Sequence, residues 1–216
     1  MEKMSGEPML KTPSEKLPET LGRIHATLHK IDPNPLKRML EAHGIDERRL
    51  SLQGLFNSIR GRIYSADYDW LGPGMDWLDE NKPEIRQVAI CHGDFHPLNI
   101  LMKEGEVSGV LDWSGFRITD PTLDVAATQV ILSIAAPVLV SRFVSERFVE
   151  QYLSAYQREF PLFPERLRYF EALRCVQALL EGADGQVVWR HPEILTQVLE
   201  RLREYTGLRI KRPSYS

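Results

Sequence analysis

The segment that decides the fold spans residues 91–126 and reads CHGDFHPLNILMKEGEVSGVLDWSGFRITDPTLDVA. It opens with the tripeptide HGD at positions 92–94, and Asn99 follows five residues after the acid of that tripeptide. An apolar run then ends in a second acid, Asp112, thirteen residues beyond Asn99. Apolar residues on both sides of the turn sequence at 103–106 predict a β-hairpin. Such a hairpin would fold Asp112 back beside Asn99.

This order of polar residues is the order that phosphoryl transfer requires. A kinase catalytic loop needs an acid that accepts the proton of the substrate hydroxyl, an amide side chain that binds magnesium, and a further magnesium-binding acid. We therefore interpret Asp94 as the catalytic base, and Asn99 and Asp112 as the magnesium ligands. Oxygen ligands of this kind suit Mg²⁺, which keeps several waters and is shared with substrate phosphates. The expected cofactors are Mg²⁺ and ATP as phosphoryl donor, and the expected partner is a small molecule with a hydroxyl group.

The rest of the chain predicts a mainly helical α+β domain. A capping sequence at 12–15 precedes one apolar stripe at helical spacing, made of Leu17, Leu21, Ile24, Leu28 and Ile31. Two or three shorter helices are expected between 36 and 81, with breaks at Gly44 and at 72–74. A short strand is expected over 88–91. Four further helices are expected near 121–136, 144–159, 165–182 and 191–206.

Composition sets the class of protein. The chain has 216 residues, of which 43% are hydrophobic and 26% charged, enough for one domain with a hydrophobic core. A net charge of -3 argues against a broad nucleic-acid surface. Two cysteines give no disulfide framework, and we see neither a signal peptide nor an apolar run near the roughly 18 residues of a membrane span. We expect a cytoplasmic protein without nucleic-acid or membrane partners.

Three motifs, HGDFHPLN, VLDW and DPTLDVA, resemble the signature of the aminoglycoside phosphotransferase and choline kinase-like family. In that family the first motif reads His-Gly-Asp-x-His-x-x-Asn, and the second acid ends a strand before an aromatic residue. The resemblance implies the C-terminal lobe of a protein-kinase-like fold, with a small β-hairpin that carries the catalytic loop. It assigns the catalytic base to Asp94 and the magnesium ligands to Asn99 and Asp112.

The resemblance extends to other polar residues. His92 and His96 match histidines that shape the loop. We assign His96 to the nucleotide-binding residues because it can lie near the phosphates, with a purely structural role as the alternative. Asp120 and Asp124 match a downstream pair that braces the catalytic segment. The helix that ends at His29 resembles the Leu-His helix of the family.

The resemblance also divides the chain. Residues 1–10 form an irregular, hinge-like segment, residues 11–208 form the catalytic-loop lobe, and residues 209–216 form a basic tail. Members of the family carry an N-terminal lobe with a β-sheet, a phosphate-covering loop and a lysine. No counterpart precedes the motifs here, so we expect this lobe to be missing. An artificial truncation, a misassigned reading frame, or a natural fragment completed by another chain would each explain this.

Alternative functions remain open. The chain is either an active phosphotransferase lobe or an inactive kinase remnant that serves as a binding module. In either case self-association or a chain that bears an N-terminal lobe would cover its exposed apolar face. A transition-metal site on the His-x-Asp-x-His sequence at 92–96 would need further ligands, for which the other histidines show no motif. Glu181, Asp184 and the acids at 76–80 are candidates to line a site for a cationic acceptor, or form a solvated face.

Overall fold

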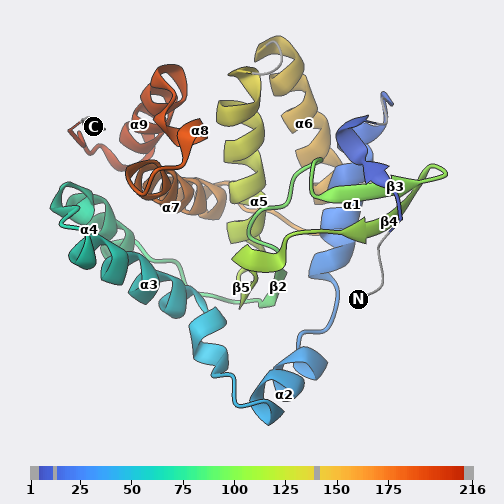
Figure 1. Cartoon of the computed structure of the whole chain (residues 1–216), viewed down its shortest axis with the longest axis horizontal. Coiled ribbons are helices and arrows are strands. Elements are labelled where there is room, and N and C mark those ends of the chain that lie inside the picture. The colour runs from blue at the N-terminus through green and yellow to red at the C-terminus, as the bar shows by residue number, and fades with distance from the viewer. Residues whose placement is uncertain (1–4, 12–13, 139–141, 212–216) are drawn as a thin grey trace.

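The computed structural model describes residues 5–11, 14–138 and 142–211, and helices dominate it (Figure 1). The helices are α1 (Leu17–His29), α2 (Asn34–Ala42), α3 (Leu52–Ser65), α4 (Gly72–Glu80), α5 (Pro121–Val130), α6 (Arg142–Glu159), α7 (Pro164–Ala183), α8 (Val187–Arg190) and α9 (Pro192–Thr206). The strands are β1 (Glu7–Pro8), β2 (Ala89–Cys91), β3 (Ile100–Lys103), β4 (Glu106–Val110) and β5 (Arg117–Thr119). The predicted fold class, mainly helical α+β, is confirmed.

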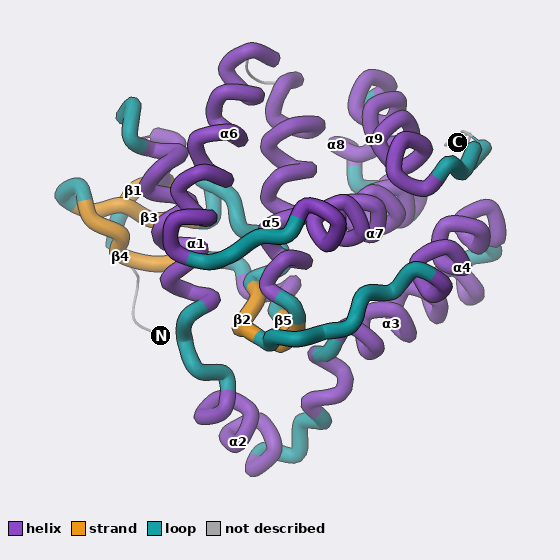
Figure 2. Tube along the Cα trace, turned by 180° about the vertical axis from the view of Figure 1, so that it is seen from behind, coloured by secondary structure: helices purple, strands orange, loops and turns teal. Residues whose placement is uncertain are grey.

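The strands form two small antiparallel sheets. Figure 2 shows β1, β3 and β4 at one side of the molecule and β2 and β5 nearer its middle. One sheet has the order β1-β3-β4, and the other pairs β2 with β5. In the first, Ile100 pairs with Val110 and Lys103 with Glu106, so the predicted hairpin is present. Both turn residues have positive φ angles, 54° at Glu104 and 84° at Gly105, as a two-residue type I′ turn requires.

The segment before α1 is more ordered than the sequence predicted. Glu7 and Pro8 form β1, which pairs with β3 through Met102 and Leu101. Met9, directly after this strand, is fully buried. Pairing with β3 therefore holds residues 7–9 against the hairpin, where the sequence predicted an irregular segment.

Helix α1 begins later, and buries a different face, than the sequence predicted. The predicted capping residues Thr12 and Pro13 lie outside the described residues, and the helix begins at Leu17 without a side-chain cap. Its buried face includes Leu21, His25, Ala26 and His29, whereas Ile31 is 50% exposed. The apolar stripe does not include the two histidines of this face, and each has a tyrosine partner inside the protein that lowers the cost of its burial.

The glycines at 72–74 do not break a helix as expected. They form the first turn of α4, where proline is tolerated because the first helical N–H groups have no partner within the helix. A side chain at Gly74 would lie 3.1 Å from Val176 and 3.4 Å from Ile210. Ile210 therefore packs on the core, although it belongs to the predicted tail, and residues 212–216 lie outside the described part.

Helix α5 lies near the centre of the molecule, between two hydrophobic clusters (Figure 1). Its Leu123 and Ala126 pack with α3, α4, α7 and α9, and its Val125 packs with α1 and α6. In the described chain, the stretch Pro121–Val138 alone matches a membrane span in length and mean hydropathy (18 residues, 1.3). The sequence prediction had found no such stretch. Because 61% of it is buried in this domain, it is also accounted for as a core helix.

Candidate active site

The loop between β2 and β3 brings three of the predicted site residues together. The Asn99 amide nitrogen donates to the backbone oxygen of Asp94 at 2.9 Å and to its Oδ2 at 3.2 Å. His96 Nε2 lies 3.3 Å from the same Oδ2. The Asp94 side chain remains 40% exposed, so a substrate can reach it.

The surroundings of Asp94 keep its carboxylate ionised. Burial by itself would raise the pKa of Asp94. The hydrogen bond and charge of His96, the charge of Arg174 and the hydrogen bond from Asn99 outweigh burial and lower this pKa below its ordinary value. At neutral pH the group is a hydrogen-bond acceptor with a negative charge.

The hairpin places Asp112 next to this loop. Leu111, one residue before Asp112, donates its N–H to the backbone oxygen of Asn99 at 2.8 Å. Asp112 has left-handed backbone angles (φ 57°, ψ 69°), which are uncommon for a residue other than glycine. Its side chain accepts the N–H of Ser114 at 3.3 Å, and this bond lowers the pKa of Asp112. An exposed, ionised carboxylate is thereby held at the end of the hairpin.

His92 ties the loop to the end of the hairpin. Its Nε2 lies 2.7 Å from the backbone oxygen of Leu111, which can only accept, so this nitrogen carries the proton. Its Nδ1 then accepts the N–H of Asp94 at 3.2 Å. Both ring nitrogens are therefore occupied, which argues against the metal site on the His-x-Asp-x-His sequence. The indole of Trp113 lies against the ring, with the centroids 4.7 Å apart.

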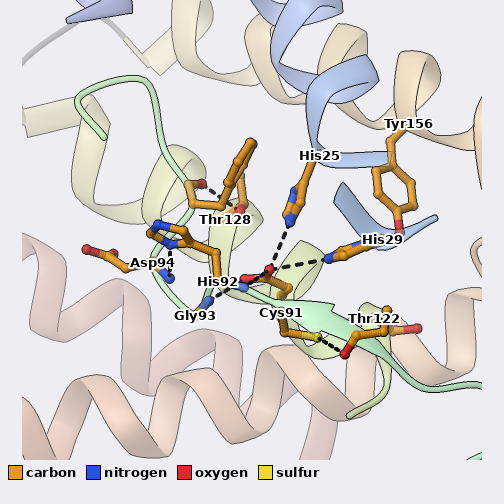
Figure 3. A network of polar contacts seen from close by, with 12 residues as sticks. His25, His29, Cys91, His92, Gly93, Asp94, Thr122, Thr128 and Tyr156 are labelled. Carbon is orange, nitrogen blue, oxygen red and sulfur yellow. Dashed lines mark hydrogen bonds and ion pairs between the residues drawn. The ribbon is translucent and has the colours of Figure 1, made fainter. Parts of the chain in front are cut away.

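Asp124 fixes the backbone at the start of the loop, where His92 and Gly93 lie (Figure 3). It is fully buried, and its two oxygens accept the N–H groups of His92 (2.5 Å) and Gly93 (2.8 Å). Burial raises the pKa of Asp124, but the interactions with His25 and His29 lower it well below its ordinary value. These bonds give Asp124 the geometry of the predicted brace.

Asp120, the other predicted brace residue, lies at the N-terminus of α5. It accepts the N–H of Thr122 at 2.9 Å and therefore caps the helix. Its other oxygen pairs with Arg166 of α7. Asp120 thus links the start of α5 to α7.

Four of the acids considered for a cationic acceptor are paired with arginines. Glu181 binds the Arg174 guanidinium with both oxygens, at 3.1 and 3.0 Å. The other pairs are Asp184 with Arg62, and Asp76 and Asp79 with Arg60. Glu181 and Asp184 thus each have an arginine partner of their own, whereas Asp76 and Asp79 share the single charge of Arg60.

A wide apolar groove of about 600 Å³ opens beside the end of the hairpin. It is lined by residues of α1, α2, β2, β4 and the turn after Asp112, namely Ile24, Thr27, Leu28, Ile31, Leu36, Ile90, Val110, Trp113 and Phe116. Trp113 is 40% exposed and Ile31 50% exposed. An exposed apolar surface therefore adjoins the candidate site.

The sequence interpretation missed several neighbours of the loop. His25 was given no role, Tyr152 and Tyr156 were not considered, and Arg174 was not connected to Asp94. The available signal was the spacing: His25 and His29, like Tyr152 and Tyr156, are four residues apart and share one helix face. Within the described ranges, the one group of three close metal-binding side chains is His25, His29 and Asp124.

Several known proteins of similar sequence or structure are phosphotransferases or kinases. The chain is 28% identical over 139 residues to an aminoglycoside 3'-phosphotransferase of Streptomyces fradiae, a match that covers 62% of this chain and 51% of the relative. It thus spans about half the length of the curated relatives it matches.

Two solved structures show the shared fold. Plasmodium vivax ethanolamine kinase has a TM-score of 0.59 at 13% identity, covering 94% of this chain and 63% of that one. A thermostable mutant of an aminoglycoside phosphotransferase, solved as a ternary complex with AMP-PNP and hygromycin B, has a TM-score of 0.59 at 17% identity. That match covers 95% of this chain and 70% of the other. Residues 1–171 match the model of the phosphotransferase enzyme family, and the chain therefore belongs to that family.

Proposed function

We propose that this chain is the catalytic-loop lobe of an ATP-dependent phosphotransferase that acts on the hydroxyl group of a small molecule. The observation that carries the proposal is the convergence of Asp94, Asn99 and Asp112 at the end of one hairpin, inside the region that matches the family. A neighbour of the same fold was solved with AMP-PNP and hygromycin B, which supports a nucleotide donor and a small-molecule acceptor.

In this proposal Asp94 acts mainly by orienting the acceptor hydroxyl. Because its pKa is lowered, the carboxylate is a weak base, and its larger contribution is to hold the hydroxyl in line for attack on the γ-phosphate. Asn99 holds the Asp94 carboxylate through its amide nitrogen, and His96 lies against the same oxygen.

The residues at the end of the hairpin fit a magnesium site. Asp112 is exposed and ionised. The side-chain nitrogen of Asn99 is hydrogen-bonded to Asp94, which leaves the side-chain oxygen of Asn99 for a cation. Asn99 and Asp112 would hold the ion, and bound Mg²⁺ would neutralise charge on the transferred phosphate. For His96 the nucleotide contact stays a prediction: its Nδ1 accepts the N–H of Leu98 and its Nε2 faces Asp94.

We further propose that residues 1–10 act as a hinge to an N-terminal lobe, and that a chain bearing this lobe covers the apolar groove. The relatives are about twice as long as the matched region, and the groove borders the residue that follows Asp112. Burying Ile31 and Trp113 would remove apolar surface from water at the site. Self-association of this chain is the competing way to cover the same face.

A phosphoryl-transfer assay tests the proposal, run with and without a relative's N-terminal lobe added. With the lobe present, Asp94→Asn is expected to reduce turnover by about 10²–10⁴-fold. Asp69→Asn, which makes the same change at an exposed position outside the loop, is expected to leave turnover unchanged. Near-normal turnover in Asp94→Asn would contradict the assignment of the base. No turnover with or without the added lobe would favour the inactive remnant. Equal turnover with and without the lobe would refute the proposal that an N-terminal lobe covers the groove.

A further inference from the structure

A buried set of polar side chains connects two helices to the catalytic loop. His25 and His29 lie on one face of α1, and Tyr152 and Tyr156 lie on the facing side of α6. The Tyr152 hydroxyl is 2.7 Å from His25 Nδ1, and the Tyr156 hydroxyl is 2.6 Å from His29 Nδ1. Each pair is one helical turn from the other, so the two contacts repeat along the helix pair.

Both imidazoles point toward Asp124. In Figure 3 the dashed lines from the rings of His25 and His29 converge beside His92 and Cys91. Their Nε2 atoms lie 3.1 Å and 3.3 Å from Asp124 Oδ2. The same carboxylate accepts the backbone N–H groups of His92 and Gly93. Two helices and the start of the catalytic loop therefore meet at one buried charge.

The partners determine where the protons lie. An ionised carboxylate only accepts, so His29 donates from Nε2, and its Nδ1 accepts the hydroxyl hydrogen of Tyr156. Burial and the nearby His29 lower the pKa of His25 to about 4, so the His25 ring is neutral at ordinary pH. Its Nε2 is close to Asp124 but poorly aligned for a hydrogen bond, which makes His29 the better donor.

We propose that His25 and His29 are positioning residues of the catalytic loop, acting through Asp124. A buried carboxylate needs its lone pairs satisfied, and two backbone N–H groups leave some of them open. His29 supplies a further donor, His25 lies beside the same carboxylate oxygen, and the tyrosines fix the orientation of the two rings. The direction of Asp124 then sets the backbone of His92 and Gly93, and with it the place of Asp94.

Simple packing does not require these residues, since apolar side chains would fill the same space without a buried charge. A metal site is the other reading of the cluster, because the ligand atoms lie within 4.8 Å of one another. We favour hydrogen bonding because His29 Nε2 already donates to Asp124, which also receives two backbone N–H groups. The inference rests on the proposed role of Asp94, but the position of the loop can be measured without any activity.

Amide hydrogen exchange on the ¹⁵N-labelled chain tests the inference. The variants are Tyr156→Phe, which removes one hydroxyl, His29→Leu, which removes the donor, and His29→Gln, which restores a donor. His43→Gln, at an exposed histidine, is the matched control. In Tyr156→Phe and His29→Leu, the protection factors of the His92 and Gly93 amides should fall by about tenfold or more. This fall is measured relative to the amides of Leu173 and Val176 in α7, which report any general loss of stability. His29→Gln should recover part of the loss.

Parallel loss of protection at all four amides, or no loss at His92 and Gly93, would overturn the inference. If His29→Leu does not fold, Tyr156→Phe carries the test, since it deletes a single oxygen atom. A tightly bound metal recovered with the wild-type chain and absent from His29→Leu would also overturn it. The exchange experiment does not depend on phosphotransferase activity. A failure of the proposed function would appear in the phosphoryl-transfer assay, whatever the amide protection shows.

Discussion

Asp94 is partly buried yet remains a carboxylate, because its neighbours compensate for the loss of water. His96, Arg174 and Asn99 together outweigh the burial that would raise its pKa. Only Asn99 and His96 could be connected to Asp94 from the sequence, since all three lie within one short loop. Arg174 lies on α7, and nothing in a single sequence indicates that this helix approaches the loop.

Gly93 is a residue whose substitution would test the geometry of the loop directly. It has φ +86°, and a Cβ there would lie 2.3 Å from the backbone oxygen of Gly115. Gly93→Ala is expected to destabilise the fold by at least about 1–3 kcal/mol and to displace the loop. Gly105 has a similar φ of +84° but open space around it, so Gly105→Ala measures the backbone strain alone. Urea unfolding of the two variants gives the comparison, and equal losses of stability would contradict a close contact at Gly93.

At the scale of elements, local sequence was informative where local chemistry determines the structure. The hairpin could be predicted because Glu104 and Gly105 suit a two-residue turn between apolar runs. The four C-terminal helices could be predicted from their apolar spacing. The buried face of α1 could not, because it includes His25 and His29, whose burial depends on Asp124 and on tyrosines 127 residues further along the chain.

The contact between α1 and α6 depends on a glycine. A Cβ at Gly22 would lie 2.4 Å from the backbone oxygen of Tyr152, so the two helices pack closely there. Gly22→Ala is expected to cost about 1–3 kcal/mol of unfolding free energy, because the helices must move apart. Gly61→Ala is the matched control, since Gly61 lies in α3 with nothing within 4 Å. It should stabilise the chain by about 0.5–1 kcal/mol through helix propensity. If denaturant titrations show that both variants change the unfolding free energy in the same direction, the close packing at Gly22 is refuted.

At the scale of the whole molecule, the buried polar cluster makes stability depend on pH. The pKa of His25 falls from an ordinary value of 6.5 to about 4 in the folded chain. Between these values the unfolded chain binds a proton that the folded chain does not. Stability is therefore complete above pH 6.5 and is lost as pH falls toward 4, by up to about 1.4 kcal/mol per pH unit. Below this range, protonation of Asp124 in the unfolded state adds to the loss, because its pKa is also lowered by folding.

Unfolding free energies measured at pH 7.5, 6 and 5 would show this loss, and His25→Phe should reduce the slope. His43→Gln, which alters an exposed histidine, should keep it. A wild-type stability that does not change over this range would contradict the neutral state of His25.

The chain covers about half of the curated relatives it matches. We expect this half to retain a metal and nucleotide site of its own. Calorimetric titration of the chain with ATP, with and without Mg²⁺, tests it most directly. We predict binding that requires Mg²⁺, disappears in Asp112→Ala and persists in Asp69→Ala, an exposed acid outside the site. No binding at millimolar nucleotide, or binding that Asp112→Ala leaves intact, would contradict the account.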